Sequence, residues 1–349
     1  MDTRDTPEQA ELRRSARRLA RELGPATVVD LADETRTKRL AGAVRDVGWL
    51  GLRDDHGDGR PLAGGVEVAI VAESLGEVLA DAAFTGPVLA ADLARRAGTK
   101  ATDGAVVGFS SSLTDPAVVP GSATAAPVFA VDVDEHGEVY VLRPDASGYR
   151  LARVVLDDSH CEPGRGSDLT RSVTATRSGA PVEAVSGQRH VLTDDDISAW
   201  SALGLALTSA DLVGAMRGVL DITVAYAAER RQFGAPVGSF QAVQHLLAEA
   251  RCLMEGSLSV ALHASWAVDD LEPDAARSAG RVAKAYCARA ARTVCETAIQ
   301  VHGGIGNTWE HPAHVYLRRA LLSSQWFGDD REQLHALQRE RLGVASGIS

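Results

Sequence analysis

The chain has 349 residues, a formal net charge of −11 at pH 7 and 45% hydrophobic residues, while aromatic residues make up only 5%. This length allows two or three domains with a sizeable core. Because aromatic side chains are few, alanine, leucine and valine must build that core, which favours helices. The acidic balance argues against binding nucleic acid through its phosphates, but it leaves room for a local basic pocket that takes a phosphorylated small molecule.

The N-terminal segment lacks the apolar central run of a signal peptide. Apolar runs elsewhere are short and interrupted, so we expect no membrane-spanning segment. The cysteines are scattered without CxxC spacing, which is typical of unpaired thiols in a reducing compartment. They are Cys161, Cys252, Cys287 and Cys295. We therefore expect a cytoplasmic protein with neither a membrane nor a nucleic acid partner.

Residues 1–103 have a helical pattern. Thr6 is placed to cap a first helix, with Pro7 at its first position and Gln9 where a capping box closes. Apolar residues then recur at helical spacing, and the arginines between them predict a solvated face. Further helices are predicted near 38–47, 66–79 and 87–97.

The pattern changes near Ala105. Short strand-like runs follow, over about 105–111, 126–134, 137–144, 149–157 and 171–178, and glycine, proline and aspartate separate them. No helix-length pattern interrupts these runs, which argues against a Rossmann sheet. We predict a small antiparallel β domain over residues 104–191.

Residues 192–349 are again helical. Val243, Leu246, Leu247, Ala250 and Leu253 form one apolar stripe at helical spacing, which predicts a core-facing helix. The alanine-rich run 275–301 predicts a long helix whose small residues allow close packing. The sequence therefore predicts a mainly α protein whose C-terminal region is a helical bundle.

Two segments carry a family resemblance: "AYAAERRQFGAPVGSFQAVQHLLAEA", beginning at Ala225, and "AIQVHGGIGNTWEHPAHVYLRRA", beginning at Ala298. Together with the order of helices, β domain and bundle, they resemble the acyl-CoA dehydrogenase family. The runs "WLGL" and "AESLGEVLA" of the N-terminal region add to the resemblance, which covers nearly the whole chain. It implies an N-terminal helical domain, a middle β domain and a C-terminal four-helix bundle.

The resemblance also implies FAD as cofactor, an acyl-CoA substrate and electron-transfer flavoprotein as electron acceptor. In the family, the first segment holds the ADP half of FAD, largely across a subunit interface. Arg230 can meet a pyrophosphate with two parallel hydrogen bonds, whereas a lysine cannot. Glycines of the second segment let the backbone approach the cofactor closely. The residues so implied are Arg230, Gln232, Phe233, Gln241, Gln300, Gly303, Gly304 and Gly306.

Two other interpretations of the second segment are disfavoured. His311 and His314 are spaced for a metal on one helical turn, but no carboxylate or cysteine completes a ligand set, and Pro312 breaks the local helix. We therefore predict no metal. The run "GGIGNT" follows a helix and lacks a third glycine in register, unlike a dinucleotide-binding fingerprint.

The sequence departs from the family at the catalytic base. Members use a glutamate at one of two places, and these correspond here to Phe327 and Gly204, neither of which can accept a proton. Asp329 and Asp330 are the carboxylates nearest the first place and are weak candidates for the base. Glu310 lies near the flavin-binding segment and is interpreted as structural.

The β domain departs as well. Members carry a "TEPxxGSD"-like segment that holds the flavin ring, whereas the corresponding run here is "GFSSSLTDPAVVPGSATA". A chain that keeps the ADP site but loses the ring site and the base resembles the short subunit of paired actinobacterial acyl-CoA dehydrogenases. Those are α2β2 heterotetramers that act on CoA thioesters of steroid side chains or similar bulky acids.

Three hypotheses follow. The chain could complete the FAD site of a longer catalytic partner in trans. It could instead be a self-sufficient homomeric dehydrogenase with an atypical base such as Asp329, or an acyl-CoA dehydrogenase-like protein without a redox role. The missing glutamates argue against the second hypothesis, and the retained Arg230, Gln241 and Gln300 argue against the third.

Overall fold

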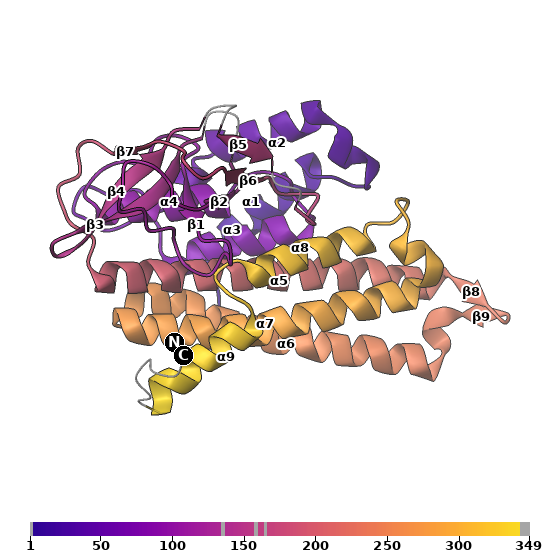
Figure 1. The fold of residues 1–349 in the computed structure, drawn as a ribbon. Helices are drawn as coiled ribbons and strands as arrows, with labels where there is room; N and C mark the ends of the chain where they lie inside the picture. The colour runs from indigo at the N-terminus through magenta and orange to yellow at the C-terminus, as the bar shows by residue number, and fades with distance from the viewer. Residues whose placement is uncertain (1–2, 134–136, 157–159, 164–165, 343–349) are drawn as a thin grey trace.

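The computed structural model describes residues 3–133, 137–156, 160–163 and 166–342. As predicted, the protein is mainly helical with one small sheet, and Figure 1 shows this sheet and the N-terminal helices lying along one side of a long helical bundle. Residues 343–349, at the end of the predicted C-terminal domain, lie outside the described ranges. So do Asp134 and Asp157, the ends of two predicted strand runs.

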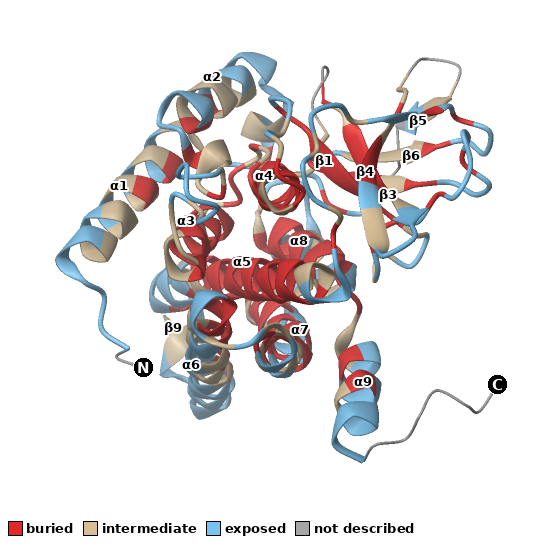
Figure 2. Ribbon diagram, turned by 90° about the vertical axis from the view of Figure 1, so that its left-hand side faces the viewer, coloured by how far each residue is buried: buried red, intermediate tan, exposed pale blue. Residues whose placement is uncertain are grey.

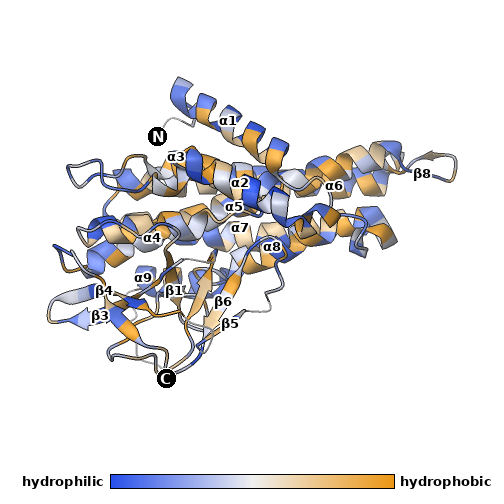
Figure 3. Ribbon diagram, turned by 90° about the horizontal axis from the view of Figure 1, so that it is seen from above, coloured by the Kyte–Doolittle hydropathy of each residue, from blue (hydrophilic) through white to orange (hydrophobic). Residues whose placement is uncertain are grey.

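The first helix, α1, begins at the predicted capping box. The Thr6 hydroxyl accepts the Gln9 amide hydrogen while the Gln9 side chain accepts that of Thr6, and α1 buries Ala16 and Ala20. Figure 3 shows the resulting mixture of hydrophilic and hydrophobic positions along α1. The N-terminal elements are α1 (Pro7–Leu23), η1 (Val29–Ala32), α2 (Glu34–Asp46), η2 (Trp49–Gly51), α3 (Gly65–Glu77) and α4 (Thr85–Arg96).

Two predictions for this region need correction. The second helix begins four residues earlier than predicted, because the Asp33 carboxylate accepts the amide hydrogens of Thr35 and Arg36. The arginines of α1 do not all face solvent. Arg13 bridges to Glu73 at 2.8 Å and Arg17 to Glu77 at 3.0 Å. These two glutamates of α3 are buried, and a buried carboxylate requires a partner that cancels its charge.

The sheet has the strand order β5-β6-β2-β1-β3-β4-β7. Its neighbours are antiparallel except β1 and β3, which run parallel, so the predicted all-antiparallel pairing is wrong for this pair. The chain reverses into β2 on one side of β1 and reverses again into β3 on the other, which leaves β1 and β3 pointing the same way. The strands are β1 (Val106–Phe109), β2 (Phe129–Val131), β3 (Val139–Asp145), β4 (Gly148–Val154), β5 (Cys161–Pro163), β6 (Val173–Thr176) and β7 (Val182–Ala184).

The bundle is built around α5, which Figure 2 shows buried along most of its length between α3, α4, α6, α7 and α8. An 18-residue window of α5 has the length and hydropathy of a membrane-spanning helix, but 94% of that window is buried inside the protein, as expected of a core helix. The C-terminal helices are α5 (Asp194–Glu229), α6 (Gln241–Asp270), α7 (Pro273–His302), α8 (Ala313–Gln325) and α9 (Asp330–Leu342).

Small residues let these helices approach closely. A Cβ added to Gly280 of α7 would lie 2.9 Å from the Leu205 side chain of α5, and one at Gly214 of α5 would lie 2.1 Å from the Glu73 carbonyl oxygen of α3. The predicted stripe of α6 faces the core at Ala250, whereas Leu246 is 39% exposed.

Candidate functional site

The two segments that carry the family resemblance meet at one end of the bundle. The C-terminus of α5, the N-terminus of α6 and the C-terminus of α7 lie there together, and Tyr226 of α5 donates a hydrogen bond to the carbonyl oxygen of His302 of α7 at 3.3 Å. Figure 1 shows the hairpin β8–β9 extending beyond this end. The structure therefore brings Arg230 and Gln300, which are far apart in sequence, to the same end of the molecule.

The hairpin pairs β8 (Arg231–Gln232) with β9 (Ala235–Pro236) through the two-residue loop Phe233–Gly234. Both loop residues have positive φ, 51° and 80°, the signature of a type I′ turn. A left-handed conformation is unfavourable for phenylalanine, and the Phe233 ring is 95% exposed. The fold thus presents an aromatic ring at the tip of a strained hairpin.

The polar side chains predicted to hold a cofactor are exposed and make no hydrogen bonds or ion pairs within the described residues. Arg230, Gln232, Gln241 and Gln300 all lie at the surface. In the part of the chain that the structure describes, none of these four side chains has a hydrogen bond or ion pair with another residue. All their donors are therefore available to a ligand.

Backbone groups at this end suit an anion. Helix α6 begins after Phe240 without a side-chain cap, and while the Val243 and Gln244 amides donate to the Phe240 carbonyl oxygen, those of Gln241 and Ala242 are free to bind phosphate. A Cβ added at Gly303 or Gly304 would meet nothing within 4 Å, and Gly303 has a φ of +66° that favours glycine. Gly306 is different, because its Cβ would lie 3.0 Å from the His302 side chain, which makes it a packing residue and not an open one.

Histidines gather beneath the glycine turn η4 (Gly303–Asn307). The rings of His302 and His311 lie 3.9 Å apart between centroids. His311 Nδ1 accepts the amide hydrogen of Ala313 at 3.2 Å. Among the described residues, no group of three or more His, Cys, Asp or Glu side chains could hold a metal ion.

Gly204 and Phe327, the two positions that the resemblance assigns to a base, touch one another. The ring of Phe327 lies against Gly204, so closely that a Cβ at Gly204 would be 2.0 Å from the ring. Phe109 and Trp200 pack on the same ring, with centroids at 5.1 Å and 5.2 Å. Trp326 completes what we call the aromatic plug: Phe109, Trp200, Trp326 and Phe327, all buried.

The plug joins three parts of the molecule. Phe109 comes from β1, Trp200 from α5, and Trp326 and Phe327 from the link between α8 and α9. The Phe327 amide donates to the carbonyl oxygen of Leu113 at 2.8 Å, within the run that replaces the family's ring-binding segment. Sequence reasoning identified Phe327 and Gly204 as altered positions but did not predict that they pack together.

The weak candidates for a base have local partners. Asp329 caps α9, since its carboxylate accepts the amide hydrogen of Glu332 at 2.9 Å. Asp330 pairs with Arg289 at 3.1 Å. Glu310 is exposed beyond η4. Each aspartate therefore has a structural role, and the identity of a base stays an open prediction.

Buried charges lie behind the plug and were missed by sequence reasoning. Arg171 lies over the Trp326 ring at 5.6 Å and pairs with Asp211 at 2.9 Å, and Arg319 reaches the same carboxylate at 2.7 Å. Lys284, fully buried, donates to the carbonyl oxygens of Ser323 and Trp326 at the end of α8. Desolvation by burial lowers the pKa of Lys284 to about 7.

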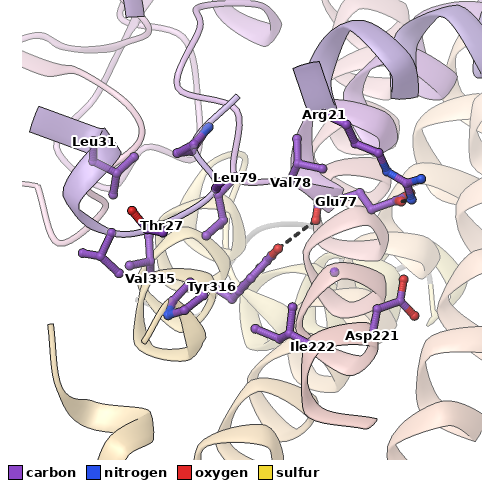
Figure 4. Close-up of a pocket in the computed structure, with 15 residues that line it drawn as sticks. Arg21, Thr27, Leu31, Glu77, Val78, Leu79, Asp221, Ile222, Val315 and Tyr316 are labelled. Carbon is purple, nitrogen blue, oxygen red and sulfur yellow. Dashed lines mark hydrogen bonds and ion pairs between the residues drawn. The ribbon is translucent and has the colours of Figure 1, made fainter. Parts of the chain in front are cut away.

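Two cavities lie away from the predicted site residues. Figure 4 shows one of about 220 Å³ between the end of α3, α5 and the start of α8, where the Tyr316 hydroxyl donates to the Glu77 carbonyl oxygen at 2.8 Å. A larger cleft of about 750 Å³ separates α2 from the loop 169–172. None of the residues implied by the resemblance lines either one.

The described residues fit the two halves of FAD unequally. The bundle end offers exposed donors, free helix amides and open glycine backbone, which suit a pyrophosphate and its nucleoside. At the two positions that the resemblance assigns to a base, the Phe327 ring packs on Gly204, and neither residue can accept a proton. The described residues thus suit the ADP half of FAD, whereas Gly204 and Phe327 offer no base for the reacting half.

Comparison with known proteins gives one family. Residues 204–342 match the family model described as acyl-CoA dehydrogenase, C-terminal domain. Acyl-CoA dehydrogenase IpdE2 of Mycolicibacterium smegmatis is 31% identical over 282 residues, covering 80% of this chain and 80% of that protein. IpdE2 of Mycobacterium tuberculosis is 30% identical over 342 residues, covering 96% and 98%. Acyl-CoA dehydrogenase FadE34 of M. tuberculosis is 36% identical over 214 residues, which span only 29% of that longer protein.

Solved structures share the fold. The Tcur3481-Tcur3483 steroid ACAD superimposes with a TM-score of 0.80 at 22% identity, covering 97% of this chain and 99% of that chain. The ChsE4-ChsE5 complex from Mycobacterium tuberculosis gives a TM-score of 0.77 at 21% identity, covering 99% and 100%.

Proposed function

This chain belongs to the acyl-CoA dehydrogenase family of oxidoreductases, and we propose that it acts as the partner subunit of a heteromeric, FAD-dependent member. In this proposal it contributes the ADP-binding half of a flavin site to a longer catalytic chain. The substrate class is a CoA thioester with a bulky acyl group such as a steroid side chain. The similarity to a steroid ACAD and to a two-component complex supports this choice.

One observation supports the proposal above all: one end of the predicted site is exposed and the other is buried. The donors at the bundle end are exposed and uncommitted, whereas the place of the base is filled by Phe327 packed on Gly204. A homomeric enzyme requires a base beside its own flavin ring. This chain has side chains for holding a dinucleotide but an aromatic ring where that base would stand.

The proposed roles follow from the positions of the side chains. Arg230 binds the pyrophosphate, because its planar fork matches two phosphate oxygens. Gln241 and Gln300 donate amide hydrogens to phosphate and ribose oxygens. Phe233, projecting from the hairpin, packs on the dinucleotide, and the exposed backbone of Gly303 and Gly304 allows close approach.

Bound FAD supplies the acceptor for the hydride that leaves the carbon β to the thioester, and electron-transfer flavoprotein would reoxidise it. The catalytic glutamate and the wall of the flavin ring site would come from the partner.

Expression alone and with a longer family member from the same operon tests the proposal. Alone, we expect a colourless or substoichiometric flavin content and no turnover of acyl-CoA thioesters with an artificial electron acceptor. Together, we expect a yellow α2β2 complex by size-exclusion chromatography with mass analysis. A yellow, active homo-oligomer would favour the homomeric alternative. Failure to co-purify with any such neighbour, with no flavin bound, would favour a protein without a redox role.

A further inference from the structure

His302 and His311 form a pair whose ring protonation states are set by their neighbours. Their centroids lie 3.9 Å apart with the rings inclined by 45°. His302 ends α7 and is buried, while His311 precedes α8 in the turn that follows η4. The pair therefore sits directly under the backbone of Gly303 and Gly304.

The hydrogen bonds assign the tautomer of His302. The Thr223 hydroxyl donates to the Val219 carbonyl oxygen at 2.5 Å, so at its 3.2 Å contact with His302 Nε2 it must accept. His302 therefore carries its hydrogen on Nε2. Its Nδ1 is buried and has no hydrogen-bond partner among the described residues, so a second proton there would find no acceptor.

His311 is held neutral in a different way. Its Nδ1 accepts the amide hydrogen of Ala313 at 3.2 Å, the first residue of α8. A proton on Nδ1 would face that amide hydrogen and the positive end of the helix dipole. A second proton on His302 would thus be a buried donor without an acceptor, and a second proton on His311 would break its contact with the Ala313 amide.

The pair connects the elements that form the nucleotide site. Tyr226 of α5 packs on the His302 ring at 4.4 Å and donates to the His302 carbonyl oxygen. The backbone of His302 leads into η4, and His311 ties the start of α8. The Tyr226–His302–His311 contacts therefore hold the end of α5, which bears Arg230, against the glycine turn.

The groups that face the pair come from each element packed against it. From α5 these are Thr223 and Tyr226, and from α8 it is His314, which in turn lies near Arg318. Trp309, between η4 and α8, lies 5.1 Å from His314 and beneath Arg318. Glu310 directly precedes His311 in the chain and is exposed, and within the described ranges neither it nor any other carboxylate forms an ion pair with the three histidines. The burial of both rings and the neighbouring His314 oppose protonation of either ring.

We propose that His302 and His311 are positioning residues for the bound nucleotide, which hold η4 and the first turn of α8 against the end of α5 only while both rings are neutral. Protonation of either ring opens this end of the bundle and releases the nucleotide. The nucleotide part of this statement rests on the proposed function, whereas the opening itself is a property of this chain alone.

Hydrogen exchange of the full chain tests the opening. Burial and the neighbouring His311 lower the pKa of His302 from 6.5 to about 4. If the opened turn restores the ordinary pKa, the opening equilibrium of residues 303–316 should rise roughly fiftyfold between about pH 7 and about pH 4.5. Exchange rates corrected for intrinsic pH dependence, measured by mass spectrometry, give this ratio.

Neutral isosteres provide the decisive comparison. His302→Gln keeps a donor toward Thr223, and His311→Asn keeps an acceptor for the Ala313 amide, yet neither titrates. The double variant should keep constant protection of residues 303–316 over the same pH range. His263→Asn, at an exposed histidine of α6, is the matched control and should behave as wild type. Equal loss of protection in wild type and the double variant, or no loss in wild type, would overturn the proposal.

The release of the nucleotide is tested separately, on the complex of this chain with its catalytic partner. FAD titration at the same two pH values should show weakened binding in wild type and little change in the double variant. If FAD fails to bind at any pH while the exchange result holds, the proposed function fails and the positioning pair stands. If FAD binds with the same pH dependence in both proteins, the pair does not position the nucleotide.

Discussion

The two ends of helix α5 are built in opposite ways. Near its start, Trp200 belongs to the aromatic plug and Gly204 is buried against it, and the charges behind the plug are all paired or hydrogen-bonded. At its end, Arg230 and the hairpin that follows are exposed, and the side-chain donors of Arg230 and Gln232 have no partner among the described residues. Strained, exposed backbone with unused donors is what a binding site requires, whereas the buried end is stabilised by dense packing. Changes at the first end should therefore alter stability, and changes at the second should alter binding.

The largest effect is expected at Gly204. Gly204→Glu should destabilise the chain by at least about 4 kcal/mol, because it forces a side chain into the Phe327 ring and buries an unpaired carboxylate. Phe327→Ala in the same chain should recover part of this loss by opening space. Urea denaturation of the two single variants and the double variant measures the coupling. A Gly204→Glu protein as stable as wild type would mean that the plug is not packed.

A matched pair of glycines separates packing from helix propensity. Gly204→Ala should destabilise by about 1–3 kcal/mol through the same contact. Gly42→Ala in α2, where an added Cβ meets nothing within 4 Å, should stabilise by up to about 1 kcal/mol. Equal shifts at the two positions would contradict the comparison.

The buried charge behind the plug should appear in the pH dependence of stability. The folded chain holds the Lys284 proton only to about pH 7, whereas the unfolded chain holds it to about 10.5. Stability should therefore rise by roughly 2–3 kcal/mol between about pH 7 and pH 9. Above that, Cys287 and Cys295 oppose the rise, because burial raises their pKa to about 12 and the unfolded chain loses those protons first.

The free energy of unfolding should therefore pass through a maximum at about pH 9, and denaturation curves at several pH values test this. Lys284→Met should abolish the rise, since methionine fills similar space without a titratable group. An equally steep rise in Lys284→Met would assign it to another residue.

At the exposed end, Arg230→Ala should weaken FAD binding by the complex ten- to a hundredfold without unfolding it. A hydrogen bond to a charged group contributes about 1.5–3 kcal/mol, and each 1.4 kcal/mol is a factor of ten. Arg230→Lys should recover only part of the affinity, because an ammonium lacks the planar fork. Titration of FAD into apo complex compares the three proteins. Equal dissociation constants would mean that Arg230 makes only a surface contact.

The smallest effect is expected at Phe233. Phe233→Asn should stabilise the isolated chain by up to about 1 kcal/mol, because asparagine tolerates the left-handed conformation and the exposed ring packs little. The same change should weaken FAD binding in the complex. Thermal denaturation of the chain measures the change in stability, and FAD titration of the complex measures the change in affinity. A destabilised chain would show that the ring, 6.4 Å from Phe240, holds the hairpin.

The sequence alone was enough to predict much of the fold. Local signals placed the start of α1 at Thr6 and the helical stripe of α6 near Ala250, because caps and periodicity depend on residues a few positions apart. The two family-like segments were enough to predict the fold class. Short strands such as β5 and β7 were not predicted, because three residues are too few to show an alternating pattern.

Only the tertiary structure decided which distant residues meet. The contact of Phe327 with Gly204, the pairing of Arg13 with Glu73, and the burial of Lys284 at the end of α8 all join segments far apart in the chain. Periodicity shows which face of a helix is apolar, but the crossing and register of the helices decide what that face touches. The sequence therefore predicted that Gly204 and Phe327 carry no base, whereas the packing of the helices placed the Phe327 ring on Gly204 and left Arg230 and Gln300 exposed.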